Sequence, residues 1–232
     1  MGVYMPDAVA LVQVDGVDYL ITANEGDASE WGEDENEYTN MTEVAIGEDS
    51  EVEVLDKEKV EGFPEVEEEV NFILGGRSFS IYKVEEEGLT QVYDSGADIE
   101  KLIAEKYPEN FNASHKNNKI DNRSDAKGPE PEELKVYVDG EKTYLFVALE
   151  RISGVLAYEL DSANELAPTF LGYCNSRDFS VEYPEDEVDP ALGDLGPEGL
   201  AIVPSENSPT GEILVLVANE VSGTVSLLEF TK

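Results

Sequence analysis

One construction recurs along this chain: a run of apolar residues that ends in a carboxylate. The tripeptide Ala-Asn-Glu closes two such runs, at residues 23–25 and 218–220, and a third run ends at Glu150. Short apolar runs bounded by polar and turn-forming residues are typical of buried strands. A strand unit that repeats favours a repeat β-fold, and it places acidic side chains at equivalent positions of the units.

Four segments share a wider pattern of short strands separated by turn signals. They start near residues 6, 71, 128 and 196, and Asp-Gly pairs at 15–16 and 139–140 predict hairpin turns. The last two segments align on the tripeptide Gly-Pro-Glu, at 128–130 and 196–198. The pattern predicts an all-β fold with about three to four β-propeller-type blades, a partial propeller whose innermost strands line a channel. We expect the acid-terminated strands to lie on that channel side.

The remaining stretches interrupt a single domain that we expect to span residues 1–232. Residues 28–70 form an acidic insertion, either a surface excursion or a strand pair. A second insertion covers 98–127: residues 98–107 have the spacing of one short helix ahead of a proline, and a polar loop follows. That loop holds the single histidine, His115, which we expect to be solvated. Because the chain opens within a strand-like repeat, we expect an N-terminally truncated piece of a larger propeller.

The charge of the chain restricts its partners. It has 53 acidic and 15 basic residues, a formal net charge of −38. Binding to nucleic acid requires the opposite sign and is excluded, and an anionic membrane surface would repel the chain. The negative potential of such a chain attracts divalent cations, although dense carboxylates also suit a saline habitat. The sequence has no apolar stretch of 18 residues, so no membrane span is predicted, and its first residues show no signal-peptide pattern.

Acidic residues at the strand ends and beside the Gly-Pro-Glu tripeptides are the candidate metal ligands. They are Glu25, Asp27, Asp125, Glu130, Glu150, Asp194, Glu198 and Glu220. If the blades repeat around an axis, these carboxylates converge on one mouth or wall of the channel, where they repel one another unless neutralised. One neutraliser is Ca²⁺, which takes carboxylate and carbonyl oxygens. The other is a salt-bridge network with Arg77, Arg123 or Arg151, which are also the candidate partners for an anion.

Several motifs together resemble the choice-of-anchor I family, whose members are also described as mesenchyme-specific cell surface glycoprotein-like. The similarity is strongest over residues 121–132, which read Asp-Asn-Arg-Ser-Asp-Ala-Lys-Gly-Pro-Glu-Pro-Glu. The other residues that carry it are 4–8, 22–27, 75–81, 94–96, 149–151, 193–199 and 218–224. The resemblance implies a secreted or cell-surface β-propeller-like domain, and it implies location and fold rather than an activity.

The resemblance predicts an extracellular or cell-surface module with an interaction or scaffolding role toward an unidentified protein or surface ligand. We expect a divalent cation, Ca²⁺, to stabilise it. The alternative is a Ca²⁺-dependent phosphoesterase of the phytase-like propeller kind, in which the metal binds phosphate and activates water. The sparse set of basic residues that could hold a phosphate, Arg77, Lys127 and Arg151, argues against that alternative. No zinc, phosphate-loop or nucleophile-elbow motif is present, so the sequence assigns no catalytic residue.

Overall fold

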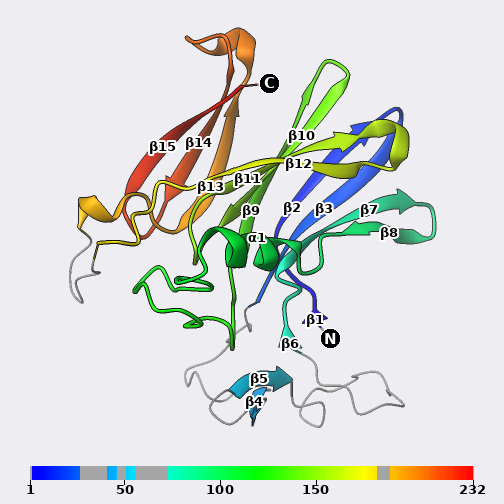
Figure 1. Ribbon diagram of the computed structural model, residues 1–232. Coiled ribbons are helices and arrows are strands. Elements are labelled where there is room, and N and C mark those ends of the chain that lie inside the picture. Colours follow the sequence, from blue (N-terminus) through cyan, green and yellow to red (C-terminus); the bar gives the residue numbers. More distant parts are fainter. Residues whose placement is uncertain (1, 27–40, 46–50, 56–72, 182–188, 232) are drawn as a thin grey trace, which may run out of the picture.

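The computed structural model describes residues 2–26, 41–45, 51–55, 73–181 and 189–231 (Figure 1). In that part of the chain the protein is mostly β, with three larger antiparallel sheets, two short strand pairs and one α-helix. The sheets do not close into a barrel. The predicted all-β fold with one short helix is confirmed, and the arrangement is that of a partial, propeller-like fold. We call the three larger sheets blade one, blade two and blade three, in chain order.

Blade one has the strand order β2-β3-β7-β8. Its strands are β2 (Met5–Val14), β3 (Val17–Glu25), β7 (Ser78–Glu85) and β8 (Gly88–Asp94). The predicted hairpin joins β2 to β3, and φ is positive at both Asp15 (51°) and Gly16 (80°), as a type I′ turn requires. Two short strand pairs accompany this blade in sequence. They are β4 (Met41–Ala45) antiparallel to β5 (Glu51–Leu55), within the acidic insertion, and β1 (Gly2–Val3) parallel to β6 (Ile73–Leu74).

Blades two and three are consecutive antiparallel meanders. Blade two contains β9 (Pro131–Asp139), β10 (Lys142–Leu149), β11 (Val155–Asp161) and β12 (Ala167–Cys174). Blade three contains β13 (Pro197–Val203), β14 (Ile213–Asn219) and β15 (Thr224–Phe230). Single 3₁₀ turns lie at Ser162–Asn164, Pro190–Leu192 and Ser205–Asn207.

The first strand of each blade is the innermost one. Strand β9 contacts both β2 and β13, so these three strands lie side by side where the blades meet. The acid-terminated strands β3, β10 and β14 each come second in their blade, one position outward. The expectation that these strands lie on the channel side was therefore wrong. Their acids still reach the centre, because the C-terminal end of a second strand lies beside the N-terminal end of its antiparallel inner neighbour.

Apolar side chains fill the space between successive blades. One buried cluster joins blade one to blade two and includes Ile21, Phe79 and Leu145. A second cluster joins blade two to blade three and includes Phe146 and Val215. Each fully buried side chain of this size contributes about 1.5–3 kcal/mol relative to the exposed state, so the two clusters fix the relative placement of the blades.

The predicted helix is present as α1 (Asp98–Lys106). Acidic residues stand in its first turn and Lys106 in its last, which suits the helix dipole. Its buried residues, Ile99 and Ile103, belong to the apolar cluster between blades one and two. None of the helices in the described residues is long and apolar enough to cross a membrane.

The repeated Ala-Asn-Glu tripeptide has a structural explanation at its asparagine. The Asn24 amide donates to the hydroxyls of Ser78 (3.0 Å) and Ser80 (2.8 Å) on the third strand of blade one. In blade three the Asn219 amide donates to the Ser226 hydroxyl (2.6 Å) in the same way. Each asparagine ties the second strand of its blade to the third, and its buried polar group is satisfied.

Candidate functional site

Acidic residues from all three blades gather at one end of the inner strands, which we call the mouth. Strand register pairs Pro6 with Asn24, Pro131 with Leu149, and Pro197 with Asn219. An acid follows each of these prolines, and another ends or follows each second strand. The acids after proline are Asp7, Glu132 and Glu198, and those of the second strands are Glu25, Glu150 and Glu220.

A β-bulge accompanies each proline-acid dipeptide. The register shifts between Pro6 and Val9 in blade one, opposite Val147–Leu149 in blade two, and between Pro197 and Gly199 in blade three. A bulge inserts one extra residue and redirects the side chain at that point, and proline is tolerated there because it has no N–H to donate. The bulges are therefore part of what aims the three acids.

The structure corrects the sequence alignment of blades two and three by two residues. The Glu150 amide donates to the Glu130 carbonyl (2.8 Å), and the Glu220 amide donates to the Gly196 carbonyl (2.7 Å). Both acceptors have left-handed backbones, with φ of 58° at Glu130 and 68° at Gly196. Position 130 therefore corresponds to Gly196, and Glu132 rather than Glu130 corresponds to Glu198. A non-glycine residue in this conformation is uncommon, and such residues cluster at functional sites.

Glu130 is the centre of a buried ionic network in blade two. Its side chain is fully buried and contacts Arg151 through both carboxylate oxygens and Lys127 Nζ at 2.8 Å. Arg151 also contacts Glu150 (Nη1 to Oε1, 3.2 Å). The Nδ1 atom of His115 lies 3.0 Å from the same Glu150 oxygen. Two cations and two buried glutamates thus compensate one another, as buried charges require.

Burial shifts the protonation of this network. Burial, reinforced by Glu150, raises the pKa of Glu130 to about 7. Burial and the neighbouring Arg151 lower the pKa of His115 to about 3, so the imidazole is neutral near pH 7. His115 is buried beside Arg151 rather than solvated, which corrects the sequence expectation. Arg177 supports this arrangement by donating to the backbone carbonyls of Arg151 (2.9 Å) and Ser114 (2.7 Å).

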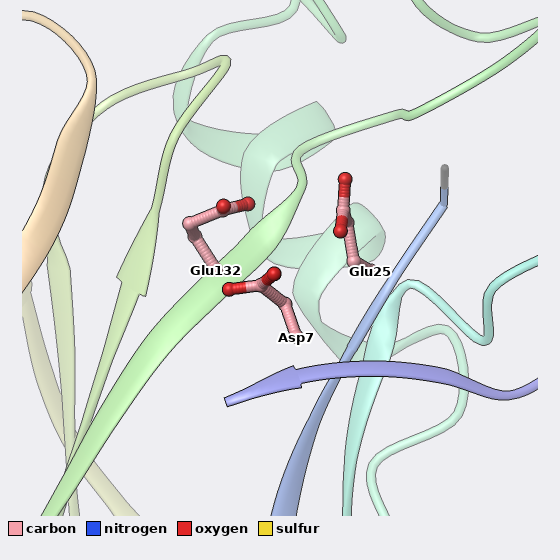
Figure 2. A group of neighbouring side chains, drawn as sticks. All are labelled: Asp7, Glu25 and Glu132. Atoms are coloured by element: carbon pink, nitrogen blue, oxygen red, sulfur yellow. The ribbon is translucent and has the colours of Figure 1, made fainter. Parts of the chain in front are cut away.

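A second group of carboxylates lies at the mouth between blades one and two. Figure 2 shows Asp7, Glu25 and Glu132 turned toward a common space, and each offers an oxygen within 4.8 Å of the others. Glu132 also belongs to a group with Glu130 and Glu150 that satisfies the same distance limit. Carboxylate oxygens at this spacing are the ligands that Ca²⁺ uses in proteins. The Nζ atom of Lys127 stands 3.4 Å from Glu25, at the side of the group.

Glu132 is the least compensated of these acids. Its Oε2 atom is buried and has no hydrogen-bond partner in the described residues. Burial, followed by repulsion from Glu25 and Asp7, raises its pKa to about 9. The side chain therefore resists ionisation in the absence of a bound cation, and a cation in the common space would favour the ionised form.

Blade three presents its acids differently. Glu198 and Glu220 are both exposed, and they interact with each other. A hydrogen bond with Glu220 and partial burial raise the pKa of Glu198 to about 7, with further repulsion from Glu150 and Asp7. Asp194 instead accepts from the hydroxyls of Ser176 (2.6 Å) and Thr224 (2.6 Å), so it serves blade three as a structural acceptor.

None of the other predicted residues belongs to either carboxylate group in the part of the chain that the structure describes. Asp27 falls outside the residues that the structure describes, and Asp125 is exposed in the loop after α1. Arg77 pairs with Glu100 of α1 (3.0 Å) and donates to two backbone carbonyls of the same loop. The Arg123 carbonyl accepts from Gly128 (2.7 Å) and helps to shape the turn that precedes Glu130.

Four residues at the mouth were not chosen from the sequence as ligands or as members of the ionic network. They are Asp7, His115, Lys127 and Glu132. The signal for two of them was the dipeptide of proline and an acid, which occurs at 6–7, 131–132 and 197–198. In blade two the dipeptide was missed because Gly-Pro-Glu at 128–130 overlaps Glu-Pro-Glu at 130–132, and the first tripeptide was aligned with blade three.

Comparison with known proteins identifies the family. A model of the choice-of-anchor I domain matches residues 1–163, a stretch that contains every mouth residue of blades one and two. Gigasin-3a from Magallana gigas is 32% identical over 158 residues, which cover 66% of this chain and 55% of that protein. The mesenchyme-specific cell surface glycoprotein of Strongylocentrotus purpuratus is 36% identical over 113 residues, 44% of this chain and 14% of that protein. The chain thus spans less than two thirds of the length of either relative. Since the family model matches more than half of the sequence, this chain belongs to the choice-of-anchor I domain family.

Proposed function

We propose that this chain is an extracellular or cell-surface interaction module whose mouth binds a Ca²⁺ ion between blades one and two. Membership of the family supports the location, as does the name of the sea-urchin relative, a cell surface glycoprotein. In this proposal the ion stabilises the way the two blades meet, and the module acts by binding rather than by catalysis.

The buried, unpartnered Oε2 atom of Glu132 is the observation that carries the cation. It stands in a group where Asp7 and Glu25 offer further oxygens within 4.8 Å. Asp7 and Glu25 come from blade one and Glu132 from blade two, so an ion held by all three would bridge the blades. A divalent cation would supply the partner that Glu132 lacks and offset the repulsion within the group.

The phosphoesterase alternative receives less support. A phosphate would need cationic side chains that face the metal. Of the three basic candidates, only Lys127 stands beside the carboxylate group, where it contacts Glu25 and Glu130. Arg151 is engaged with Glu130, and Arg77 is engaged with Glu100 and loop carbonyls. We therefore propose no hydrolytic step.

Thermal unfolding in Ca²⁺ and in a chelator tests the cation, in at least 0.15 M NaCl to screen the diffuse charge of the chain. Ca²⁺ at one hundred times its dissociation constant should stabilise the protein by about 2.7 kcal/mol. Glu132→Gln should lose most of that gain, whereas the matched variant Glu220→Gln in blade three should keep it. An unchanged midpoint in the wild type, or an equal gain in all three proteins, would overturn the proposed site.

A further inference from the structure

A cationic side chain of the protein itself lies where the two carboxylate groups of the mouth meet. The Nζ atom of Lys127 is 3.4 Å from Glu25, which belongs to the group with Asp7 and Glu132. The same atom is 2.8 Å from Glu130, which belongs to the other group. Glu25 ends β3 of blade one and Glu130 directly precedes β9 of blade two, so the ammonium group links the two blades at the mouth.

The backbone around Lys127 fixes the position of this ammonium group. Lys127 lies in a turn in which the Gly128 amide donates to the Arg123 carbonyl (2.7 Å). A Cβ atom at Gly26 would lie only 3.0 Å from the Lys127 Cα atom, so the end of β3 and this turn are in close contact. The Lys127 side chain is 18% exposed. The fold therefore holds the lysine at the mouth, partly shielded from solvent.

Lys127 and Arg151 differ in the acids that they contact. Arg151 pairs with Glu130 and Glu150, the buried glutamates of blade two. Lys127 shares Glu130 with Arg151, so Glu130 keeps a cationic partner if the Lys127 charge is removed. Lys127 also contacts Glu25, which is a proposed ligand of the Ca²⁺ ion. Loss of the Lys127 charge should therefore affect a bound ion more than it affects the fold.

We infer that Lys127 is a specificity-determining residue of the mouth, which sets the affinity for a cation and the discrimination between cations of different charge. The inference rests on the proposed function, because it concerns the same Ca²⁺ site. An ammonium group that contacts a ligand of the ion repels the ion and offsets one carboxylate charge. Removal of this positive charge should therefore tighten cation binding.

The effect of Lys127 should grow with the charge of the ion. An ion bound to the Glu25 oxygen that Lys127 contacts would lie at most about 6 Å from Nζ, because a Ca²⁺ ligand stands within roughly 2.6 Å of the ion. This separation is shorter than the Debye length of about 8 Å at physiological salt. Coulomb energy is proportional to ionic charge, so a change that tightens Ca²⁺ binding about tenfold should tighten Tb³⁺ binding about thirtyfold.

Calorimetric titration of the full chain with CaCl₂ and with TbCl₃, in 0.15 M NaCl, tests the inference. Lys127→Gln should bind Ca²⁺ at least about tenfold more tightly than the wild type, and the gain for Tb³⁺ should be larger. Lys127→Met is a second neutral variant, whose side chain offers no oxygen to the ion. Lys127→Arg keeps the charge and should stay within about threefold of the wild type. Addition of Glu132→Gln to each protein identifies binding at the mouth as the part that is lost.

A matched control separates the local effect from the effect of net charge. Lys142 begins β10, and the other end of this strand lies at the mouth, about 24 Å away at the usual rise per residue. Lys142→Gln removes the same charge well beyond the Debye length, so its affinity for Ca²⁺ should match that of the wild type. Equal gains in Lys127→Gln and Lys142→Gln would overturn the inference.

The outcomes distinguish this inference from the proposed function. Binding at the mouth of the wild type, with no gain in either neutral Lys127 variant, would overturn the inference and leave the proposed function in place. Equal gains for Ca²⁺ and Tb³⁺ would contradict the selection by charge. Binding confined to the neutral variants would support the role of Lys127 and contradict the proposed function. No binding that depends on Glu132 in any of the proteins would overturn both.

Discussion

Blades two and three have the same backbone at the mouth, but the acids on it differ in burial and in pairing with cations. In blade two, Glu130 occupies a left-handed position and is buried with Arg151, whereas blade three has glycine at the matching position and Val221 after its strand-end acid. The strand-end acid is buried in blade two, as Glu150, and exposed in blade three, as Glu220. The shared backbone therefore accommodates either a buried ionic network or exposed acids, and the network occurs in blade two, the blade that adjoins blade one.

This comparison separates the acids that stabilise the mouth from those that are available to bind a cation. Glu130 and Glu150 are compensated by Arg151, Lys127 and His115, so they brace the mouth. Glu132 has a buried oxygen without a hydrogen-bond partner in the described residues, and it shares a group with Asp7 and Glu25 of blade one, so it is the more suitable ligand. In blade three Glu198 and Glu220 face solvent, so they add negative potential at the mouth and do not form a buried site.

Removal of Arg151 should have the largest effect on the free energy of unfolding. Arg151→Met leaves Glu130 buried without its main partner, and breaking a buried ion pair typically costs about 3–5 kcal/mol. The matched variant Val221→Met in blade three, which involves no charge, should cost less than about 1 kcal/mol. Urea unfolding at pH 8, above the pKa of about 7 at Glu130, measures both. Equal losses in the two variants would show that the ionic network does not brace blade two.

The asparagine of the tripeptide supplies the next test. Blade two has Leu149 at the position of Asn24 and Asn219, and Leu149 is fully buried in an apolar cluster with Leu156. Leu149→Asn should cost about 3 kcal/mol, because it removes apolar burial and leaves a buried amide without partners. Asn219→Leu should cost less, since the Ser226 hydroxyl is only partly buried and water can replace the lost bond. If unfolding experiments find Leu149→Asn neutral, blade two has an acceptor that the structure does not show.

Stability should fall as pH rises from 7 to 9 in the presence of a chelator. Glu132 has a folded pKa of about 9, above its ordinary value of 4.5, so the folded state holds the extra proton and loses stability as pH rises toward 9. Glu130 and Glu198 act in the same direction below and near pH 7. His115, with a lowered pKa, acts in the opposite direction only between about pH 3 and 6.5 and is neutral in both states above that.

The slope of this fall cannot exceed about 1.4 kcal/mol per pH unit for one proton. Glu132→Gln should flatten the profile between pH 7 and 9, and Ca²⁺ should flatten it in the wild type by favouring the ionised form. Chemical unfolding at several pH values gives both profiles. A variant as steep as the wild type would assign the effect to another group.

The left-handed backbone at the start of the inner strands gives the smallest effect. Glu130→Gly and Glu130→Ala lose the same charge, but glycine adopts the φ of 58° without strain, so the glycine variant should be more stable by about 1 kcal/mol. In blade three, Gly196→Ala should cost at least as much, because its Cβ would also lie 2.5 Å from Val221 Cγ2. Guanidinium unfolding midpoints measure these differences, and a more stable alanine variant at position 130 would refute the correspondence with Gly196.

Local signals were sufficient for most elements of this fold. Helical spacing predicted α1, and apolar runs bounded by turns predicted most strands of the three blades, although not β8 or β12. The segments that start near residues 6 and 71 were read as separate units, but the structure joins them in blade one. The convergence of Glu25, Glu130 and Glu150 also followed from the position of each acid beside a strand end. What could not be predicted was the order of strands within a blade, because inner and second strands have similar apolar patterns.

Tertiary register decided the rest of the site. Two proline-containing frames overlap in residues 128–132. The strand register and the hydrogen bond from the Glu150 amide to the Glu130 carbonyl show which one matches blade three. The burial of His115 has a similar origin. Its loop is polar by composition, but Arg177 holds the backbone at Ser114 against blade two.

Anomalous diffraction from crystals grown with Tb³⁺ in place of Ca²⁺ tests the central claim most directly. The account predicts one dominant peak within about 2.6 Å of carboxylate oxygens of Asp7, Glu25 and Glu132, and its loss in Glu132→Gln. Peaks confined to Glu198, Glu220 or other exposed acids, with none at this group, would contradict it.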